Sequence, residues 1–119
     1  FEIEIFIDDK NDVQFLIIKD EITKSLKSGS GFEKTTSSLA LRAILGKTST
    51  LPMPNFITFD EVLGKVAPEN LEKLKMLFDK IKNMYNIVFL ITHNDLIRDW
   101  GEKLITVTKE NNISSVVIK

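Results

Sequence analysis

The stretch Asn55-Phe-Ile-Thr-Phe-Asp-Glu61 decides the fold, because a short apolar run delivers two adjacent carboxylates at its end. Apolar runs of this length between loops that contain proline and glycine are typical of a strand buried on both faces, as inside a parallel sheet. Ligands of such sheets gather at the carboxyl ends of the strands. Asp60 and Glu61 are therefore well placed to hold a divalent metal and to polarise a water, the arrangement that phosphoryl transfer needs. The alternative is that two solvated acids simply follow a core strand.

Length and composition indicate one compact α/β unit. The chain has 119 residues, of which 43% are hydrophobic and 28% charged, enough for one core of ordinary size. A formal net charge of -1 provides no basic field, so composition gives no support for nucleic-acid binding. With no cysteine there is no disulfide framework and no thiolate metal site, which fits a reducing cytosol.

The sequence also predicts that the chain does not enter a membrane. No apolar run approaches the roughly 20 residues that a membrane span needs, and no signal-peptide pattern opens the chain. We therefore expect a soluble, cytoplasmic protein. Because Phe1 already lies within a strand pattern, we also expect the chain to be a piece of a longer protein.

A single domain is expected, with four segments in order. Residues 1–27 alternate apolar and polar side chains around a polar turn, which predicts an antiparallel hairpin, and the polar residues 20–28 then predict a loop or one loose helical turn. Residues 28–46 combine a Ser-Gly loop with a helix for which Gly46 is a natural C-cap. Residues 55–95 contain two apolar strands on either side of a helix over 69–85 with a 3.6-residue period, and Asp95 is then the predicted cap of a short helix to Trp100. Residues 103–118 predict a C-terminal hairpin.

The strand, helix and strand between residues 55 and 95 form a predicted βαβ unit. Its crossover makes the two strands parallel neighbours. Asp60, Glu61 and His93 then lie at the same edge of the sheet. This convergence favours a functional role for His93, and the alternative is a hydrogen-bonded structural histidine.

The glycine-rich stretch from Ser28 to Lys34 does not match a phosphate-binding P-loop. In the pattern G-x-x-x-x-G-K-[ST], Lys34 falls where the second glycine belongs, and a second near match at Gly46 follows a helix instead of a strand. What remains is a Ser-Gly turn that opens a helix, which is a generic anion site. Ser30 and Glu33 also have the spacing of a capping box, and on spacing alone this second interpretation is favoured.

Three ordered motifs resemble those of an ABC-type ATPase head. They are Ser28-Gly-Ser-Gly-Phe-Glu-Lys34 with the following Ser38-Leu-Ala-Leu-Arg-Ala-Ile-Leu45, then Phe56-Ile-Thr-Phe-Asp-Glu61, then Leu90-Ile-Thr-His-Asn-Asp95. These look like the signature motif, the Walker B strand and the His switch. The nearest branch is the SMC-like, SbcC-type DNA repair ATPases and the related large subunits of phage recombination endonucleases.

The resemblance implies an α/β fold that is the C-terminal half of a P-loop NTPase (ABC-type) head. Its core strands would be mainly parallel, with helices and flanking hairpins. The Walker A lobe is absent from these residues, since the family places it in an N-terminal lobe beyond a long coiled coil. The implied function is that of the C-terminal ATPase lobe of a DNA double-strand break repair or recombination protein. The chain alone is expected to be inactive.

The resemblance also implies roles in the signature segment. Ser30, Gly31, Phe32 and Glu33 would contact the γ-phosphate of ATP held by the opposite head, so they would act in trans. The family has a basic residue in the following helix that couples nucleotide state to head movement, and Arg42 stands there. Arg42 is alternatively only a surface charge.

At the carboxyl edge, the resemblance implies that Asp60 holds Mg²⁺ and that Glu61 orients or deprotonates the attacking water. His93 would sense the γ-phosphate. The implied cofactors are ATP and Mg²⁺. The implied partners are the Walker A lobe, a second head in a homodimer, an SbcD-type nuclease subunit, and DNA through the assembled complex, in a bacterium or in the host cytoplasm of a phage.

Two departures from the family pattern keep an alternative open. Phe32 and Glu33 replace the second glycine and the glutamine of the signature, and Ala67 stands where an aspartate is expected in the loop after the acid pair. The alternative is a non-catalytic SMC-type scaffold, or a degenerate ATPase head that acts as a protein-interaction module. A transporter-type nucleotide-binding domain is a third and weaker interpretation, since nothing in the sequence suggests membrane coupling.

Overall fold

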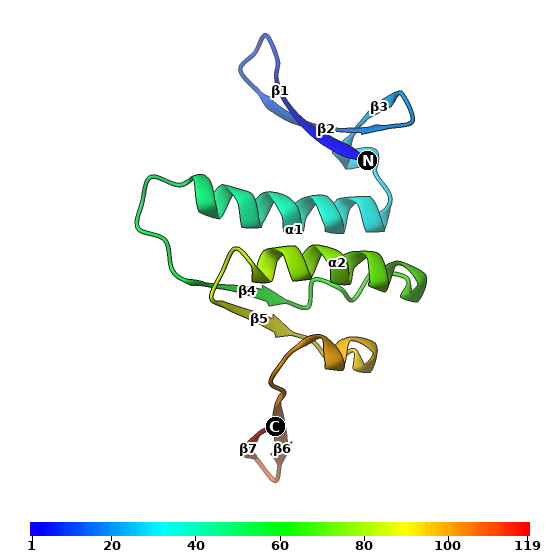
Figure 1. Ribbon diagram of the computed structural model, residues 1–119. Coiled ribbons are helices and arrows are strands. Elements are labelled where there is room, and N and C mark those ends of the chain that lie inside the picture. Colours follow the sequence, from blue (N-terminus) through cyan, green and yellow to red (C-terminus); the bar gives the residue numbers. More distant parts are fainter.

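The structure, a computed structural model, describes residues 1–119 and places two α-helices among three separate sheets (Figure 1). In chain order the elements are β1 (Glu2–Ile7), β2 (Val13–Lys19), β3 (Ile22–Ser25), the 3₁₀ turn η1 (Leu26–Ser28), α1 (Gly31–Thr48), β4 (Phe56–Asp60), η2 (Pro68–Asn70), α2 (Leu71–Lys82), β5 (Ile87–Ile91), η3 (Asp95–Trp100), β6 (Ile105–Glu110) and β7 (Ile113–Ile118). Asn94, not Asp95, caps η3, because its side chain accepts the amide of Leu96.

The antiparallel sheet β1–β2–β3 lies beside the N-terminal end of α1 (Figure 1). The sequence predicted two strands and then a loop, and that prediction was wrong for β3. Asp20 and Glu21 both adopt positive φ, 50° and 65°, as a two-residue type I′ hairpin turn requires. Neither residue is the asparagine or glycine that normally marks this turn, so the local signal was weak.

β4 and β5 pair in parallel, with Phe56 opposite Ile87 and Asp60 opposite Ile91. α2 makes the crossover between them, as the βαβ prediction requires. Both strands therefore end at the same edge, where the N-terminal ends of α1 and α2 also lie (Figure 1).

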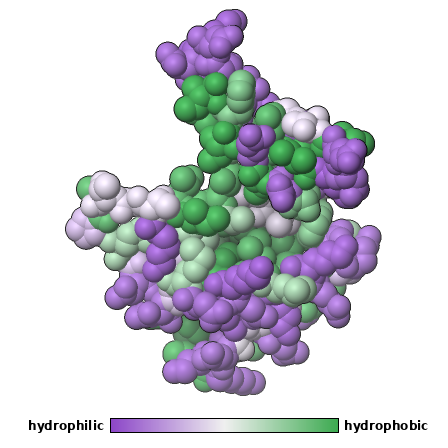
Figure 2. Space-filling model, turned by 45° about the horizontal axis from the view of Figure 1, so that its top comes forward, coloured by the Kyte–Doolittle hydropathy of each residue, from purple (hydrophilic) through white to green (hydrophobic).

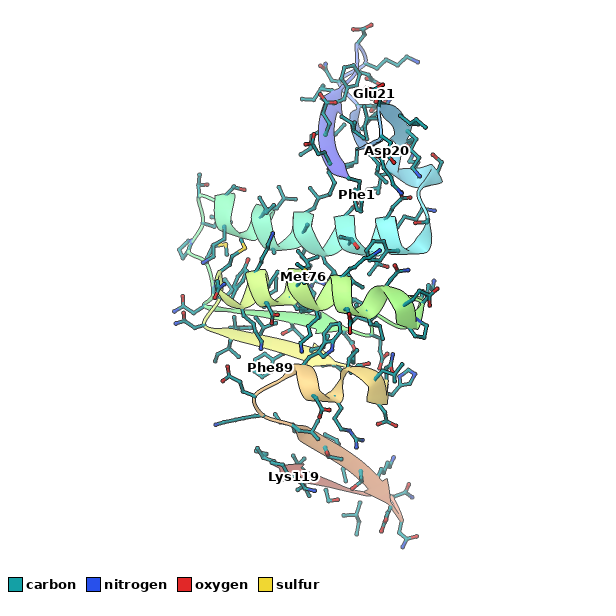
Figure 3. The ribbon with its side chains drawn as sticks, turned by 45° about the vertical axis from the view of Figure 1, so that its right-hand side comes forward. Phe1, Asp20, Glu21, Met76, Phe89 and Lys119 are labelled. Atoms are coloured by element: carbon teal, nitrogen blue, oxygen red, sulfur yellow. The ribbon has the colours of Figure 1, made fainter.

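Only one face of the β4–β5 sheet is covered. Ile57 and Phe59 are buried, whereas Phe56 is 50% and Phe89 42% exposed. Figure 3 shows Phe89 on the side of the sheet away from α2. The prediction that β4 is buried on both faces was therefore wrong for this chain, because both helices pack on the same face.

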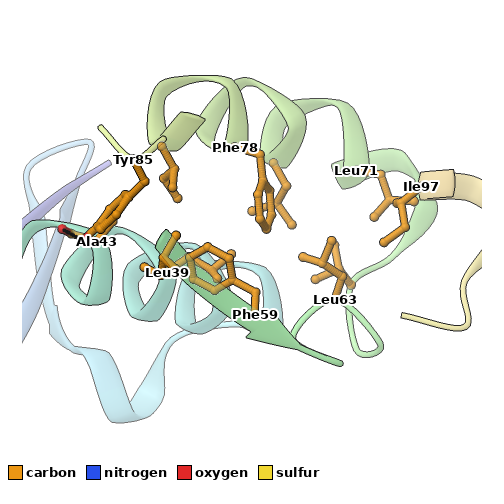
Figure 4. Close-up of a cluster of buried hydrophobic side chains, with 12 residues drawn as sticks. Leu39, Ala43, Phe59, Leu63, Leu71, Phe78, Tyr85 and Ile97 are labelled. Atoms are coloured by element: carbon orange, nitrogen blue, oxygen red, sulfur yellow. Dashed lines mark hydrogen bonds between the residues drawn. The ribbon is translucent and has the colours of Figure 1, made fainter. Parts of the chain in front are cut away.

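The core is one cluster of 12 buried residues between α1, α2 and the covered face of the β4–β5 sheet (Figure 4). Phe59 and Phe78 lie at its centre, with ring centroids 5.3 Å apart in an edge-to-face arrangement. The predicted helical periodicity of α2 is confirmed by its buried side chains, Leu71, Leu74, Phe78 and Ile81.

α1 continues past Gly46 to Thr48, so the prediction that Gly46 caps this helix was wrong. Gly46 instead allows the hydroxyl oxygen of Tyr85 to approach the helix backbone closely, because a Cβ atom at position 46 would collide with that oxygen. That hydroxyl donates a hydrogen bond of 2.9 Å to the carbonyl oxygen of Ala43. Gly46 thus allows Tyr85 to join α1 to the end of α2.

The chain is extended for its length. Its radius of gyration is 17.1 Å, whereas a compact domain of this length has roughly 13–14 Å. Apolar side chains remain exposed on β1 and β2, among them Ile5, Ile7 and Val13, and Figure 2 shows hydrophobic surface just below the hydrophilic tip of the molecule. All residues of the β6–β7 hairpin are exposed. The chain therefore leaves several apolar surfaces uncovered.

The uneven burial of β4 gives a direct test of the core. Phe59→Ala should lower the free energy of unfolding by about 3–5 kcal/mol, because it opens a cavity in the cluster. Phe56→Ala, the matched control on the uncovered face, should cost less than about 1 kcal/mol. Urea denaturation of both variants measures the difference, and equal losses would contradict the one-sided burial of the strand.

Candidate functional site

The carboxyl edge of the β4–β5 sheet carries Asp60 and Glu61 side by side. Asp60 is the last residue of β4, and the amide of Glu61 donates a hydrogen bond of 2.9 Å to the carbonyl oxygen of Ile91. The backbone of Glu61 has a φ of 48°, in the left-handed region that residues other than glycine adopt rarely. Sparsely populated backbone conformations of this kind occur often at functional sites.

His93 pairs with Glu61 at this edge. Its Nδ1 atom lies 2.8 Å from Oε1 of Glu61, so an Nδ1–H group donates to the carboxylate. The His93 side chain is 88% exposed and that of Glu61 42%, so solvent or a substrate reaches both. A carboxylate that already accepts one proton donor and keeps a second oxygen free is suited to bind a water through that oxygen.

Asp60 is exposed and makes no side-chain hydrogen bond or ion pair. The chain contains no group of three or more His, Cys, Asp or Glu side chains that could hold a metal ion by themselves. Mg²⁺ is commonly bound through one or two carboxylates, with water and substrate phosphates as the remaining ligands. A single free carboxylate at this edge fits that mode of binding, and it does not fit a metal held by protein ligands alone.

The Ser30–Glu33 segment forms the complete capping box that its spacing predicted. The Ser30 side chain accepts the amide of Glu33 at 3.2 Å, and Oε2 of Glu33 accepts the amide of Ser30 at 2.8 Å. Both amides are thereby used within the helix, so the capping interpretation describes this structure.

Lys24 also contacts the capping box, and the sequence did not predict this contact. Its Nζ atom lies 2.8 Å from Oε2 of Glu33. The hydrogen bond from Lys24, together with the one from the Ser30 amide, lowers the pKa of Glu33 from an ordinary 4.5 to about 2. Lys24 lies on β3, the strand that was not predicted, and so no spacing rule placed it near Glu33.

The Ser30–Glu33 segment lies close to the loop that follows Glu61. An ideal Cβ atom on Gly31 would be 3.7 Å from the carbonyl oxygen of Lys65. Phe32 packs against the edge of the core cluster, with Nζ of Lys73 6.0 Å from its ring centroid. The segment and the acidic edge therefore share one end of the molecule.

Arg42 and Ala67 also have defined surroundings. The guanidinium carbon of Arg42 lies 5.8 Å from the ring centroid of Phe59, the residue directly before Asp60. Ala67 precedes η2 and provides no side-chain cap. A contact through Phe59 links α1 physically to the acid pair, whereas Ala67 has only a methyl group to offer a partner.

Comparisons with known proteins point to one fold. No family model matches the chain. An uncharacterized protein of Acanthamoeba polyphaga mimivirus is 28% identical over 93 residues, which are 78% of this chain and 7% of that protein. The chain thus spans only a small part of the length of this curated relative.

The chain is similar to solved structures of SMC head domains over most of its length. A structure from work on ATP-driven dimerization and DNA-stimulated activation of SMC ATPases has a TM-score of 0.79 at 19% identity, with 98% of this chain and 72% of that chain covered. The SMC head domain from Thermotoga maritima has a TM-score of 0.71 at 30% identity, with 87% of this chain and 38% of that chain covered.

A third SMC head, derived from Pyrococcus furiosus and bound to the C-terminal domain of ScpA, has a TM-score of 0.74 at 20% identity, with 98% and 30% covered. The α/β fold is therefore that of part of an SMC-type ATPase head, and the fold expected from the motifs is confirmed. No helix combines the length and apolar character that crossing a membrane requires.

Glu33 should make stability depend on pH in acid. Because its pKa is about 2 in the folded chain and 4.5 ordinarily, the ionised carboxylate stabilises the fold above pH 4.5. That contribution is lost as the pH falls from 4.5 through about 2. Glu33→Gln should remove it, so the melting temperature of the variant should fall less over this range than that of the wild type.

The matched control for this measurement is Glu69→Gln, because Glu69 is exposed and forms no ion pair. Thermal unfolding at a series of pH values should show wild-type acid sensitivity for the control. An equal fall for Glu33→Gln and the wild type would contradict the ion pair with Lys24.

Proposed function

We propose that the chain is the C-terminal lobe of an SMC-type ATPase head, which hydrolyses ATP when a lobe carrying the Walker A motif completes it. The observation that carries this proposal is the meeting of Asp60, Glu61 and His93 at one sheet edge, in a fold shared with SMC heads. The sequence has no P-loop match of its own, so a nucleotide site needs a second lobe.

An open groove between β5 and β6 supports the need for a second lobe. It has a volume of about 510 Å³ and is lined by Val88–Thr92 on one side and by Leu104, Ile105 and Val107 on the other. β5 is hydrogen-bonded only to β4, and β6 only to β7, so each strand has a free edge. Free strand edges are templates for pairing with another strand. A strand of the complementary lobe fits this position.

The uncovered face of the β4–β5 sheet supports the same conclusion. Phe56, Ile87, Phe89 and Ile91 are each between 42% and 51% exposed and lie in a continuous parallel register. Exposed apolar patches of this kind mark interaction surfaces. A lobe that adds a strand beside β5 would also cover these side chains.

In the completed head, the acidic edge would carry out hydrolysis. Glu61 would orient the attacking water and accept its proton through the oxygen that His93 leaves free. Asp60 would hold Mg²⁺, which when bound neutralises charge on the phosphates. His93, held at 2.8 Å from Glu61, is exposed enough to contact a phosphate and to report its presence to the base.

The Ser30–Glu33 segment would contact the nucleotide held by a second head. It lies at the same end of the molecule as the acidic edge, and helix N-termini attract anions. Since the capping box uses two amides internally, Gly31 and Phe32 carry the amides that remain for a phosphate. ATP would then hold two heads together as well as being the substrate.

The finer assignment follows from the motifs. The order of the signature, Walker B and His-switch motifs resembles the SbcC-type branch, so we infer a role in DNA double-strand break repair or recombination with an SbcD-type nuclease and DNA. The solved SMC heads include complexes with ScpA, a different partner. Purification of the complete protein with each candidate partner distinguishes the two assignments.

The first test is ATP binding and hydrolysis by the chain, alone and with a Walker A lobe added as a second polypeptide. We expect no tight Mg-ATP binding by the chain alone and binding with turnover after the second lobe is added. In the completed head, Glu61→Gln should preserve ATP binding and lower turnover by about 10²–10⁴-fold, because it removes the base. Glu69→Gln should leave turnover unchanged.

Each other outcome has a clear meaning. Tight binding by the chain alone would show a complete nucleotide site and would overturn the proposed half-head. Binding without turnover in the completed wild-type head would favour the non-catalytic scaffold, which the alanine at position 67 allows. Full turnover in Glu61→Gln would remove this residue from the role of base.

The docking face can be tested by a charge on its apolar surface. Phe89→Asp should abolish association with the Walker A lobe, because a buried unpaired carboxylate in the interface is costly. Met76→Asp is the matched control, since Met76 is 67% exposed on α2 and lies on the opposite side of the sheet (Figure 3). Analytical ultracentrifugation measures association, and equal binding by both variants would contradict this docking face.

A further inference from the structure

The ion pair between Lys24 and Glu33 joins the β1–β2–β3 sheet to α1. Among the hydrogen bonds of the chain it is the only one that connects this sheet with that helix. Gly29, just before the helix, is also closely packed, since a Cβ atom there would lie 3.0 Å from Cδ1 of Ile17 and 3.5 Å from Cβ of Glu33. Lys24 stands opposite Ile17 in the β2–β3 ladder, which fixes its position relative to the helix start.

Lys24 neutralises the negative charge of Glu33 in the Ser30–Glu33 segment. The Glu33 side chain is only 10% exposed, and its carboxylate lies next to the amides that would face a phosphate. An unpaired carboxylate there would repel an anion and would itself be costly to bury. The Lys24 side chain, 37% exposed, places its ammonium group on the same oxygen that accepts the Ser30 amide. The pair therefore keeps the charge near zero and the segment in place.

We propose that Lys24 is a positioning residue for nucleotide binding by the Ser30–Glu33 segment. Its ammonium group neutralises Glu33 and holds the carboxylate on the Ser30 amide, so that the segment can accept a phosphate of the ATP carried by a second head. This inference rests on the proposed function. It assigns the positioning of the Ser30–Glu33 segment to a residue of β3 that lies outside all three motifs. In this mechanism Lys24 contacts neither the nucleotide nor the water that attacks it.

The test uses the complete protein with its Walker A lobe and four variants. Lys24→Met should weaken ATP-dependent association of heads at least about tenfold, because Glu33 is left as an uncompensated charge. Glu33→Gln should weaken association less than Lys24→Met does, since its amide oxygen can still accept the Ser30 amide, and it is the reference for the double variant, not a neutral control. The double variant should associate as Glu33→Gln does, because the charge that Lys24 neutralises is gone. Lys27→Met is the matched control, since Lys27 is exposed and forms no ion pair.

Two readouts separate positioning from a general loss of stability. The melting temperature of each variant is measured, and association is compared well below it. Hydrogen exchange of the Ser30 amide should become faster in Lys24→Met and return toward the wild-type rate in the double variant. If Lys24 acted only through stability, Lys24→Met would associate as the wild type does once both are compared well below their melting temperatures.

The outcomes also separate this inference from the proposed function. If wild-type heads do not associate with ATP, the proposed function fails, and with it the role of Lys24 toward nucleotide. If wild-type heads associate and Lys24→Met does so equally well, only the inference about Lys24 is overturned. The inference is likewise overturned if the double variant associates as weakly as Lys24→Met. It is also overturned if the Ser30 amide exchanges at the same rate in Lys24→Met and in the double variant.

Discussion

The parallel pairing of β4 with β5 is the constraint on which the rest of the structure depends. Its last hydrogen bond, from the amide of Glu61 to the carbonyl of Ile91, fixes where the chain leaves the sheet. Because both strands end at the same edge, His93 follows two residues later within reach of Glu61. The core stabilises this pairing, since α1 and α2 pack on Ile57 and Phe59 and leave the carboxyl edge of the sheet exposed. One backbone register therefore decides both the packing and the site.

The sequence predicted what depends on short-range patterns. The βαβ unit, the meeting of Glu61 with His93 and the capping box all follow from spacing along the chain, and the structure has each of them. It did not predict features that depend on tertiary context. The exposure of Phe56 depends on which helices lie on which face, and a continuous apolar run is the same whether one face or two are covered. Lys24 was missed because an ion pair across a sheet–helix junction leaves no periodic signal.

The extended shape and the uncovered sheet face have one physical explanation. A two-stranded parallel sheet buries too little by itself, since parallel sheets are normally covered on both faces. Here one face has its helices and the other keeps apolar side chains in solvent. The free edges of β5 and β6 border the same groove, so the missing surface has a defined place. In the proposed head, such a chain would gain stability and a nucleotide site from the same association event, so folding of the complete head and assembly of its active site would be thermodynamically linked.

The ion pairs of Glu61 with His93 and of Glu33 with Lys24 differ in burial, and this difference suits them to different tasks. Glu61 and His93 are paired at 42% and 88% exposure, where an ion pair contributes little and is easily exchanged for another partner. Glu33 and Lys24 are paired at 10% and 37% exposure, so removal of Lys24 leaves a nearly buried carboxylate without its cation. In the proposed mechanism, the first pair would open at low cost when a phosphate arrives, whereas the second would stay closed so that the start of α1 keeps its geometry. The difference in burial therefore suits Glu61 and His93 to respond to the proposed nucleotide and suits Glu33 and Lys24 to hold the proposed binding surface in place.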